Sequence, residues 1–184
     1  MATEETKSAH IGRQHNLFAI SVRQPFADLI VSGIKPVDNR TYKLNLTGVI
    51  LIHASKTLEP NWEEMLSSKA RVIANKHVSR LRIGSLGFNP FPLGAIVGAA
   101  IIDHTDDFYS SNWCMRDHYY VWLTNPVKFS KPIQCTGYLK IFRPAIMLNQ
   151  FPARDRAELN RLYSISTALG LQKLPITNFQ EFSS

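Results

Sequence analysis

The chain has 184 residues, of which 45% are hydrophobic, and a formal net charge of +7 at pH 7. That length fits one domain with tails, and the apolar content excludes a disordered protein. The longest apolar runs are too short for a membrane-spanning helix, and the polar start of the chain lacks the apolar core of a secretory signal. Cys114 and Cys135 are the only cysteines and lack metal-ligand spacing. We therefore expect an intracellular protein with free thiols (cytoplasmic, or nuclear in a eukaryote), with no metal, cofactor or membrane association.

The positive charge lies in the middle of the chain. Residues 21–143 hold 15 Lys and Arg against nine Asp and Glu, whereas residues 1–20 are neutral and residues 144–184 carry +1. An excess inside the folded part, rather than in a tail, favours a shaped anionic partner such as nucleic acid. Charge that serves only solubility is the alternative.

Apolar periodicity and Pro and Gly positions predict the elements in chain order. The expected strands are 17–22, 36–42, 48–54, 95–102, 119–124, 127–133 and 137–142. The expected helices are 25–32, 60–76 and 152–168, with loops at 81–94 and 104–117 and a turn at Asn125 and Pro126. Short strands with helices between them predict an α+β domain or barrel. We place a disordered tail at 1–15, the domain at 16–143 and a helical extension at 144–184.

Charged and polar side chains gather where predicted elements end. Lys35, Asp38 and Arg40 follow Gly33, and on an extended strand residues 38 and 40 share a face. The other members of the predicted cleft end two neighbouring strands: Arg23, Gln24, His53, Ser55 and Lys56. Lys35 and Arg40 suit phosphate, while Asp38 can orient Arg40 or accept a hydrogen bond from a base edge. We therefore expect a basic cleft for a nucleotide or an unstacked base.

Two further sets of residues extend this expectation. Trp122 alternates with Tyr120 on a strand and is a candidate for base stacking, with a core position as the alternative. The loop residue Trp113 is a second stacking candidate, because loops are exposed. Lys69, Lys76 and Arg80 share one face of a continuous helix and are candidates for contact with a nucleic-acid backbone.

On these residues the sequence resembles the ASCH family, named for the activating signal cointegrator homology domain. The resemblance rests on SVRQPFADLI at 21–30, GIKPVDNR at 33–40 and IHASK at 52–56, and it covers about 17–143. It implies a PUA-like β-barrel with flanking helices, RNA or DNA binding, and a cleft lined by the second motif. RNA is preferred over duplex DNA, because such folds usually bind unstacked bases.

The resemblance also leaves two alternatives open. Some small bacterial members resemble amidohydrolases that remove an acyl group from acetylated cytidine, using a Lys and a Thr of the same motif. Here Asp38 stands in place of that Thr, so a hydrolase would use Lys35 and Asp38 with help from His53. The second alternative is a protein-interaction or regulatory module with a vestigial cleft.

Overall fold

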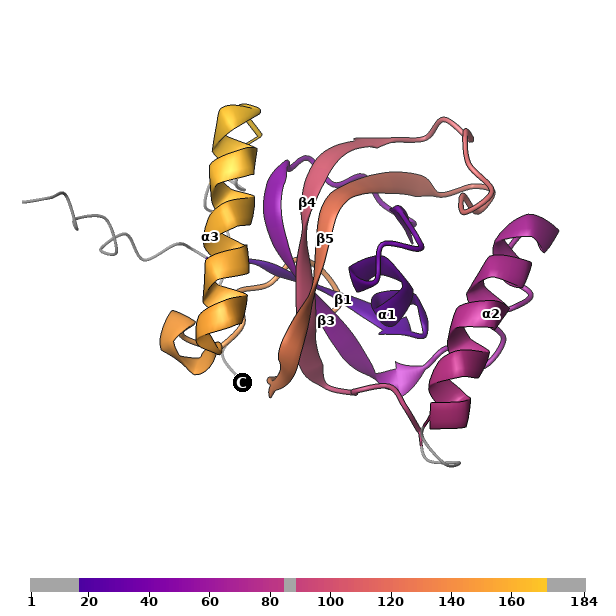
Figure 1. Cartoon of the computed structure of the whole chain (residues 1–184). Coiled ribbons are helices and arrows are strands. Elements are labelled where there is room, and N and C mark those ends of the chain that lie inside the picture. Colours follow the sequence, from indigo (N-terminus) through magenta and orange to yellow (C-terminus); the bar gives the residue numbers. More distant parts are fainter. Residues whose placement is uncertain (1–16, 85–88, 172–184) are drawn as a thin grey trace, which may run out of the picture.

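The computed structural model describes residues 17–84 and 89–171, with one curved five-stranded sheet at its centre (Figure 1). The strands are β1 (Ala19–Gln24), β2 (Val37–Arg40), β3 (Gly48–Leu58), β4 (Ala95–Asp106) and β5 (Tyr119–Gln134). The helices are α1 (Phe26–Val31), α2 (Ser68–Gly84) and α3 (Ala153–Ala168), preceded by a short 3-10 helix, η1 (Leu148–Gln150). Within the described ranges, no helix has the length and apolarity needed to cross a membrane. The predicted N-terminal tail lies outside these ranges.

The sheet has the strand order β1-β3-β4-β5-β2. β1 pairs with β3 in parallel, and the other three pairs are antiparallel. A mixed sheet with three flanking helices confirms the predicted α+β class, in the form of a half-barrel. A bridge between Ala19 and Phe142, and a hydrogen bond of 3.4 Å from Tyr42 Oη to Leu139 O, place the segment 139–142 between the two edge strands.

Side chains alternate across this sheet into two cores. Ile20 and Ile52 face the side covered by α1 and α2. Ala19 and Leu51 face the other side, where Leu159 of α3 packs against them. Figure 1 shows α3 on one side of the sheet, with α1 and α2 on the other. The nearly continuous apolar runs of β3 and β4 follow from this, because strands covered on both faces need few polar residues.

The predicted break between residues 124 and 127 was wrong, because β5 is one strand from Tyr119 to Gln134. The ladder pairs Ala99 with Val127 and Ile101 with Thr124. Residues 125 and 126 therefore oppose a single residue of β4, which is the geometry of a β-bulge. Bulges accept a proline and a residue with positive φ, here 49° at Asn125.

Three other boundaries also differ from the prediction. α2 starts at Ser68, since Ser67 Oγ accepts a hydrogen bond of 3.3 Å from Ala70 N and caps the helix, whereas residues 60–65 form turns. α2 continues to Gly84, into the predicted loop 81–94. The predicted strand 137–142 is reduced to the bridge at Phe142.

Candidate functional site

Arg40 connects the two edge strands through its side chain. Its Nε donates to Asp38 Oδ2 at 2.6 Å, and its Nη2 donates to the backbone oxygen of Ser21 on β1 at 3.0 Å. The Arg40 side chain is only 11% exposed, so this ion pair is largely removed from water. The pair thus helps to close the half-barrel as well as placing charge there.

Lys35 lies inside the same region and is 2% exposed. Its Nζ donates to Val37 O and lies 5.5 Å from the centre of the Phe26 ring. Burial lowers the pKa of Lys35 to about 8, although the nearby Asp38 carboxylate opposes that shift. A buried cation costs stability, and such perturbed groups concentrate at functional sites.

His53 on β3 is 1% exposed and fully bonded. Its Nε2 lies 3.2 Å from Cys135 O, which can only accept, so Nε2 carries the hydrogen. Nδ1 then accepts from Ser21 Oγ at 3.0 Å. Burial lowers the pKa of His53, and a side chain at Gly137 would overlap its ring. This packing is that of a neutral core histidine.

Ser21, Lys35, Asp38, Arg40 and His53 together form what we call the buried polar network. The sequence predicted four of its members, but Ser21 was named only as part of the motif. No sequence signal marks the contact of Ser21, because the register of β1 on β3 alone pairs it with His53.

Arg23 and Gln24 lie apart from this network. Arg23 is exposed and pairs with Glu59 at 2.8 Å. Gln24 is buried, and its Nε2 donates to Pro92 O at 3.2 Å while its Oε1 accepts from Asp28 N at 2.9 Å. Gln24 and Glu59 line a separate, mostly apolar pocket of about 430 Å³.

The remaining predicted cleft residues occupy other surfaces. Ser55 Oγ lies 3.2 Å from Thr57 Oγ1 near the exposed end of β3, and Lys56 is exposed beside it. Trp122 stacks on His104, with ring centres 5.9 Å apart. The structure therefore does not gather all the predicted residues into one cleft. Trp113, expected to be exposed, is buried.

Sequence reasoning missed a second charge cluster, centred on the buried Asp28 of α1. Asp28 Oδ1 accepts from Lys128 Nζ of β5 at 2.5 Å, and its Oδ2 accepts from His77 Nε2 of α2 at 2.7 Å. These contacts join α1, α2 and β5. The available signal was one acid within the otherwise apolar helix FADLIV.

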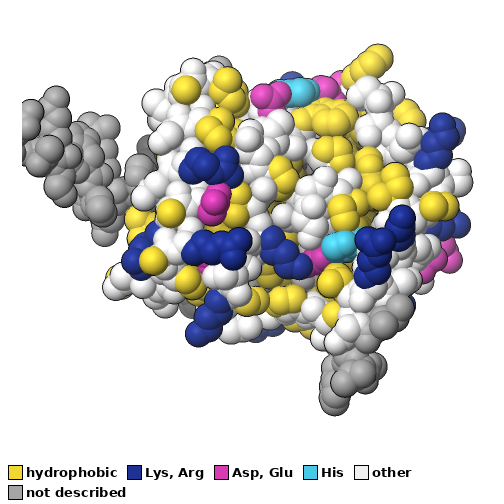
Figure 2. All heavy atoms as spheres, viewed as in Figure 1, with side chains coloured by type: hydrophobic (Ala, Val, Ile, Leu, Met, Phe, Trp, Pro, Cys, Tyr) yellow, Lys and Arg dark blue, Asp and Glu magenta, His cyan; other side chains and the backbone are white. Residues whose placement is uncertain are grey.

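The net positive charge resides on α2, β5 and α3. These elements hold ten Lys and Arg against two Asp and Glu. The rest of the chain holds eleven Lys and Arg against twelve Asp and Glu. All ten cations are exposed: Lys69, Arg71, Lys76, Arg80, Arg82, Lys128, Lys131, Arg154, Arg156 and Arg161. Figure 2 shows Lys and Arg side chains over α3, over β5 and beside α2 on one side of the molecule, which we call the basic face.

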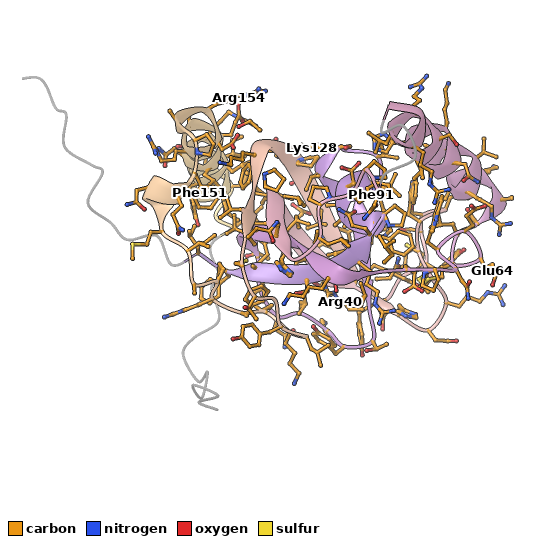
Figure 3. The ribbon with its side chains drawn as sticks, turned by 90° about the horizontal axis from the view of Figure 1, so that it is seen from below. Arg40, Glu64, Phe91, Lys128, Phe151 and Arg154 are labelled. Atoms are coloured by element: carbon orange, nitrogen blue, oxygen red, sulfur yellow. The ribbon has the colours of Figure 1, made fainter. Side chains whose placement is uncertain are left out.

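Both acids of these elements bond to groups of the same elements. Asp155 is buried and accepts hydrogen bonds from Ser130 N and Oγ at 2.9 to 3.1 Å. Glu158 pairs with Arg161 at 2.8 Å. In Figure 3, Lys128 and Arg154 lie on one side of the molecule and Arg40 on the opposite side. The basic face and the buried polar network are therefore separate regions.

No protein-family model and no curated protein matches the chain. Among solved structures, the chain is similar to an ASCH protein from Zymomonas mobilis, with 14% identity and a TM-score of 0.42, over 80% of this chain and 95% of that one. A single-substitution variant of that protein gives 14% identity and a TM-score of 0.43, over 82% of this chain and 98% of that one.

Proposed function

We propose that this protein binds RNA through the basic face. The observation that carries the proposal is the concentration of ten exposed cations on α2, β5 and α3, whereas the rest of the chain has a net charge of −1. Cations that neutralise phosphates release condensed counterions, which drives binding to nucleic acid. Charge for solubility alone would not need to be confined to three elements.

The start of α2 supports this proposal. Its first turn contains no acid, and Lys69 and Arg71 lie near the N-terminal end. The helix dipole disfavours cations at that end by about 0.3–1 kcal/mol. Their position therefore opposes helix stability and favours an external anion.

Single-stranded RNA is the preferred partner because of the loop between β4 and β5. Phe108 and Tyr109 in this loop are 73% and 54% exposed. Exposed aromatic rings can stack on unpaired bases, which a duplex does not offer.

The test is fluorescence anisotropy with single-stranded RNA, single-stranded DNA and duplex DNA over a salt series. We expect Lys76→Glu/Arg80→Glu on α2 to weaken RNA binding by roughly tenfold or more, with a shallower salt dependence. The matched control is Lys43→Glu/Lys140→Glu, which makes the same change in charge on either side of the contact between Tyr42 and Leu139. Equal losses in both variants, or no binding by the wild type, would contradict the proposal.

A second candidate function is hydrolysis of an acylated nucleoside, and the lowered pKa of Lys35 favours it. A pKa of about 8 leaves a fraction of this amine unprotonated at neutral pH, as a base or nucleophile requires. Against it, Asp38 is engaged by Arg40 and His53 is enclosed. Release of acetate from acetylated cytidine that disappears in Lys35→Ala would establish this activity, and absence of turnover in the wild type would exclude it for that substrate.

A further inference from the structure

A second site lies where β4 ends and β5 begins. A surface pocket of about 570 Å³ there is lined by tyrosines, carboxylates, one arginine and one histidine: Asp107, Tyr109, Arg116, Asp117, His118, Tyr119 and Tyr120. We propose that this pocket binds one unstacked base of the RNA, and that the base carries an exocyclic amino group. The inference rests on the proposed function and adds a site of base recognition to it.

The tyrosines provide a stacking surface that is held in place. The Tyr109 ring packs edge-on against Tyr120, with ring centres 6.4 Å apart and an interplanar angle of 72°. Tyr120 is buried, and its hydroxyl donates to Met115 O at 2.7 Å. An exposed ring braced by a fixed one loses little freedom when a base stacks on it.

The charges in the pocket favour a base over a phosphate. Asp107 and Asp117 outnumber Arg116, so a phosphate inside the pocket would meet net negative charge. Carboxylates accept hydrogen bonds from amino groups such as that of cytosine. His118 Nδ1 donates to Arg116 O at 2.7 Å, so its ring is held against the same loop.

The pocket adjoins the start of the basic face. Ser67 Oγ donates to Asn112 O at 2.8 Å and so joins the β4–β5 loop to the N-terminal end of α2. Figure 1 shows this loop beside one end of α2. An RNA strand that follows Lys76 and Lys69 along α2 therefore arrives at Tyr109.

The experiment compares three ribose-phosphate oligomers of equal length and charge: oligocytidylate, oligouridylate and an abasic oligomer. For the wild type we expect the tightest binding to oligocytidylate and the weakest to the abasic oligomer. Tyr109→Ala should bind oligocytidylate roughly tenfold more weakly. The same variant should bind the abasic oligomer as the wild type does, and Tyr109→Phe, which keeps the ring, should retain the preference for bases.

Three outcomes would overturn the inference. Unchanged oligocytidylate binding in Tyr109→Ala would show that the pocket does not bind a base. The proposal that the basic face binds RNA would still stand. Oligouridylate that binds as tightly as oligocytidylate would exclude amino-group recognition. A wild type that binds none of the three oligomers would overturn the proposed function together with this site.

Discussion

The buried polar network and the basic face use the same types of side chain under opposite conditions. In the network, Lys35 and Arg40 are enclosed, and their donors bond to Asp38, to the Tyr42 hydroxyl or to backbone oxygens. On the basic face, cations such as Lys76 and Arg154 stand in water. Enclosed charges change the free energy of unfolding strongly, whereas exposed charges change it little. Residues of the network therefore stabilise or destabilise the fold, whereas residues of the basic face are available to a partner.

Asp38→Ala should have the largest effect on the fold. The substitution leaves the Arg40 guanidinium buried without its carboxylate, which costs about 3–5 kcal/mol. Urea denaturation measures this loss. Glu59→Ala is the matched control, because its partner Arg23 is 57% exposed and that pair contributes about 0–1 kcal/mol. Similar small losses in both variants would show that the Arg40–Asp38 pair is no better shielded from water than the Arg23–Glu59 pair.

Lys35→Met should stabilise the protein at neutral pH. The fold lowers the pKa of Lys35 from 10.5 to about 8, so the unfolded chain binds this proton more tightly. The free energy of unfolding therefore falls as the pH drops from 10.5 to 8. Below pH 8 the full cost of burying the charged amine is present. The gain from the substitution is at most about 3 kcal/mol at pH 7 and disappears towards pH 10.5.

The same variant also tests where RNA binds. If the basic face carries binding, Lys35→Met should bind RNA as the wild type does. A loss of roughly tenfold would instead place Lys35 in the RNA site, as the sequence motif predicted.

His53 should make the fold sensitive to acid. Burial lowers its pKa below the ordinary value of 6.5, so the unfolded chain takes up a proton first as the pH falls. The stability contributed by the neutral ring is present above pH 6.5 and is lost as the pH falls below it. Unfolding measured between pH 7 and 5 should show a shallower decline in His53→Gln than in the wild type. Parallel declines would mean that other groups control the acid response.

Arg154→Ala should have the smallest effect. It removes one exposed cation, so the free energy of unfolding should change by less than about 0.5 kcal/mol. RNA binding should weaken slightly at low salt, and the salt slope should fall by about one unit. A variant with an unchanged slope would place Arg154 outside the path of the RNA.

The elements that sequence predicted best are those whose signals are local. Gly33, with positive φ, ends α1, and the nearly continuous apolar run of β3 follows from burial on both faces. The bulge at Asn125 and Pro126 could not be predicted, because a turn and a bulge use the same residues. Only the partner strand β4 decides between them.

The same limit applies to the sites. Lys35, Asp38 and Arg40 lie within six residues, so their proximity follows from the motif. Asp28, His77 and Lys128 meet only through the packing of α1, α2 and β5, and no sequence spacing indicates such a contact. The basic face likewise emerges only when the fold brings cations of three distant elements to one side of the molecule.

The packing of α3 bears on how this protein is made in the cell. Leu51 of β3 is covered by Phe151 and Leu159, which lie 100 and 108 positions further along the chain. At 5–20 residues per second, synthesis of the stretch from Leu51 to Leu159 takes roughly 5 to 20 s. During that interval the apolar side chains of β3 that α3 later covers lack their partners, and exposed apolar surface of this kind favours aggregation.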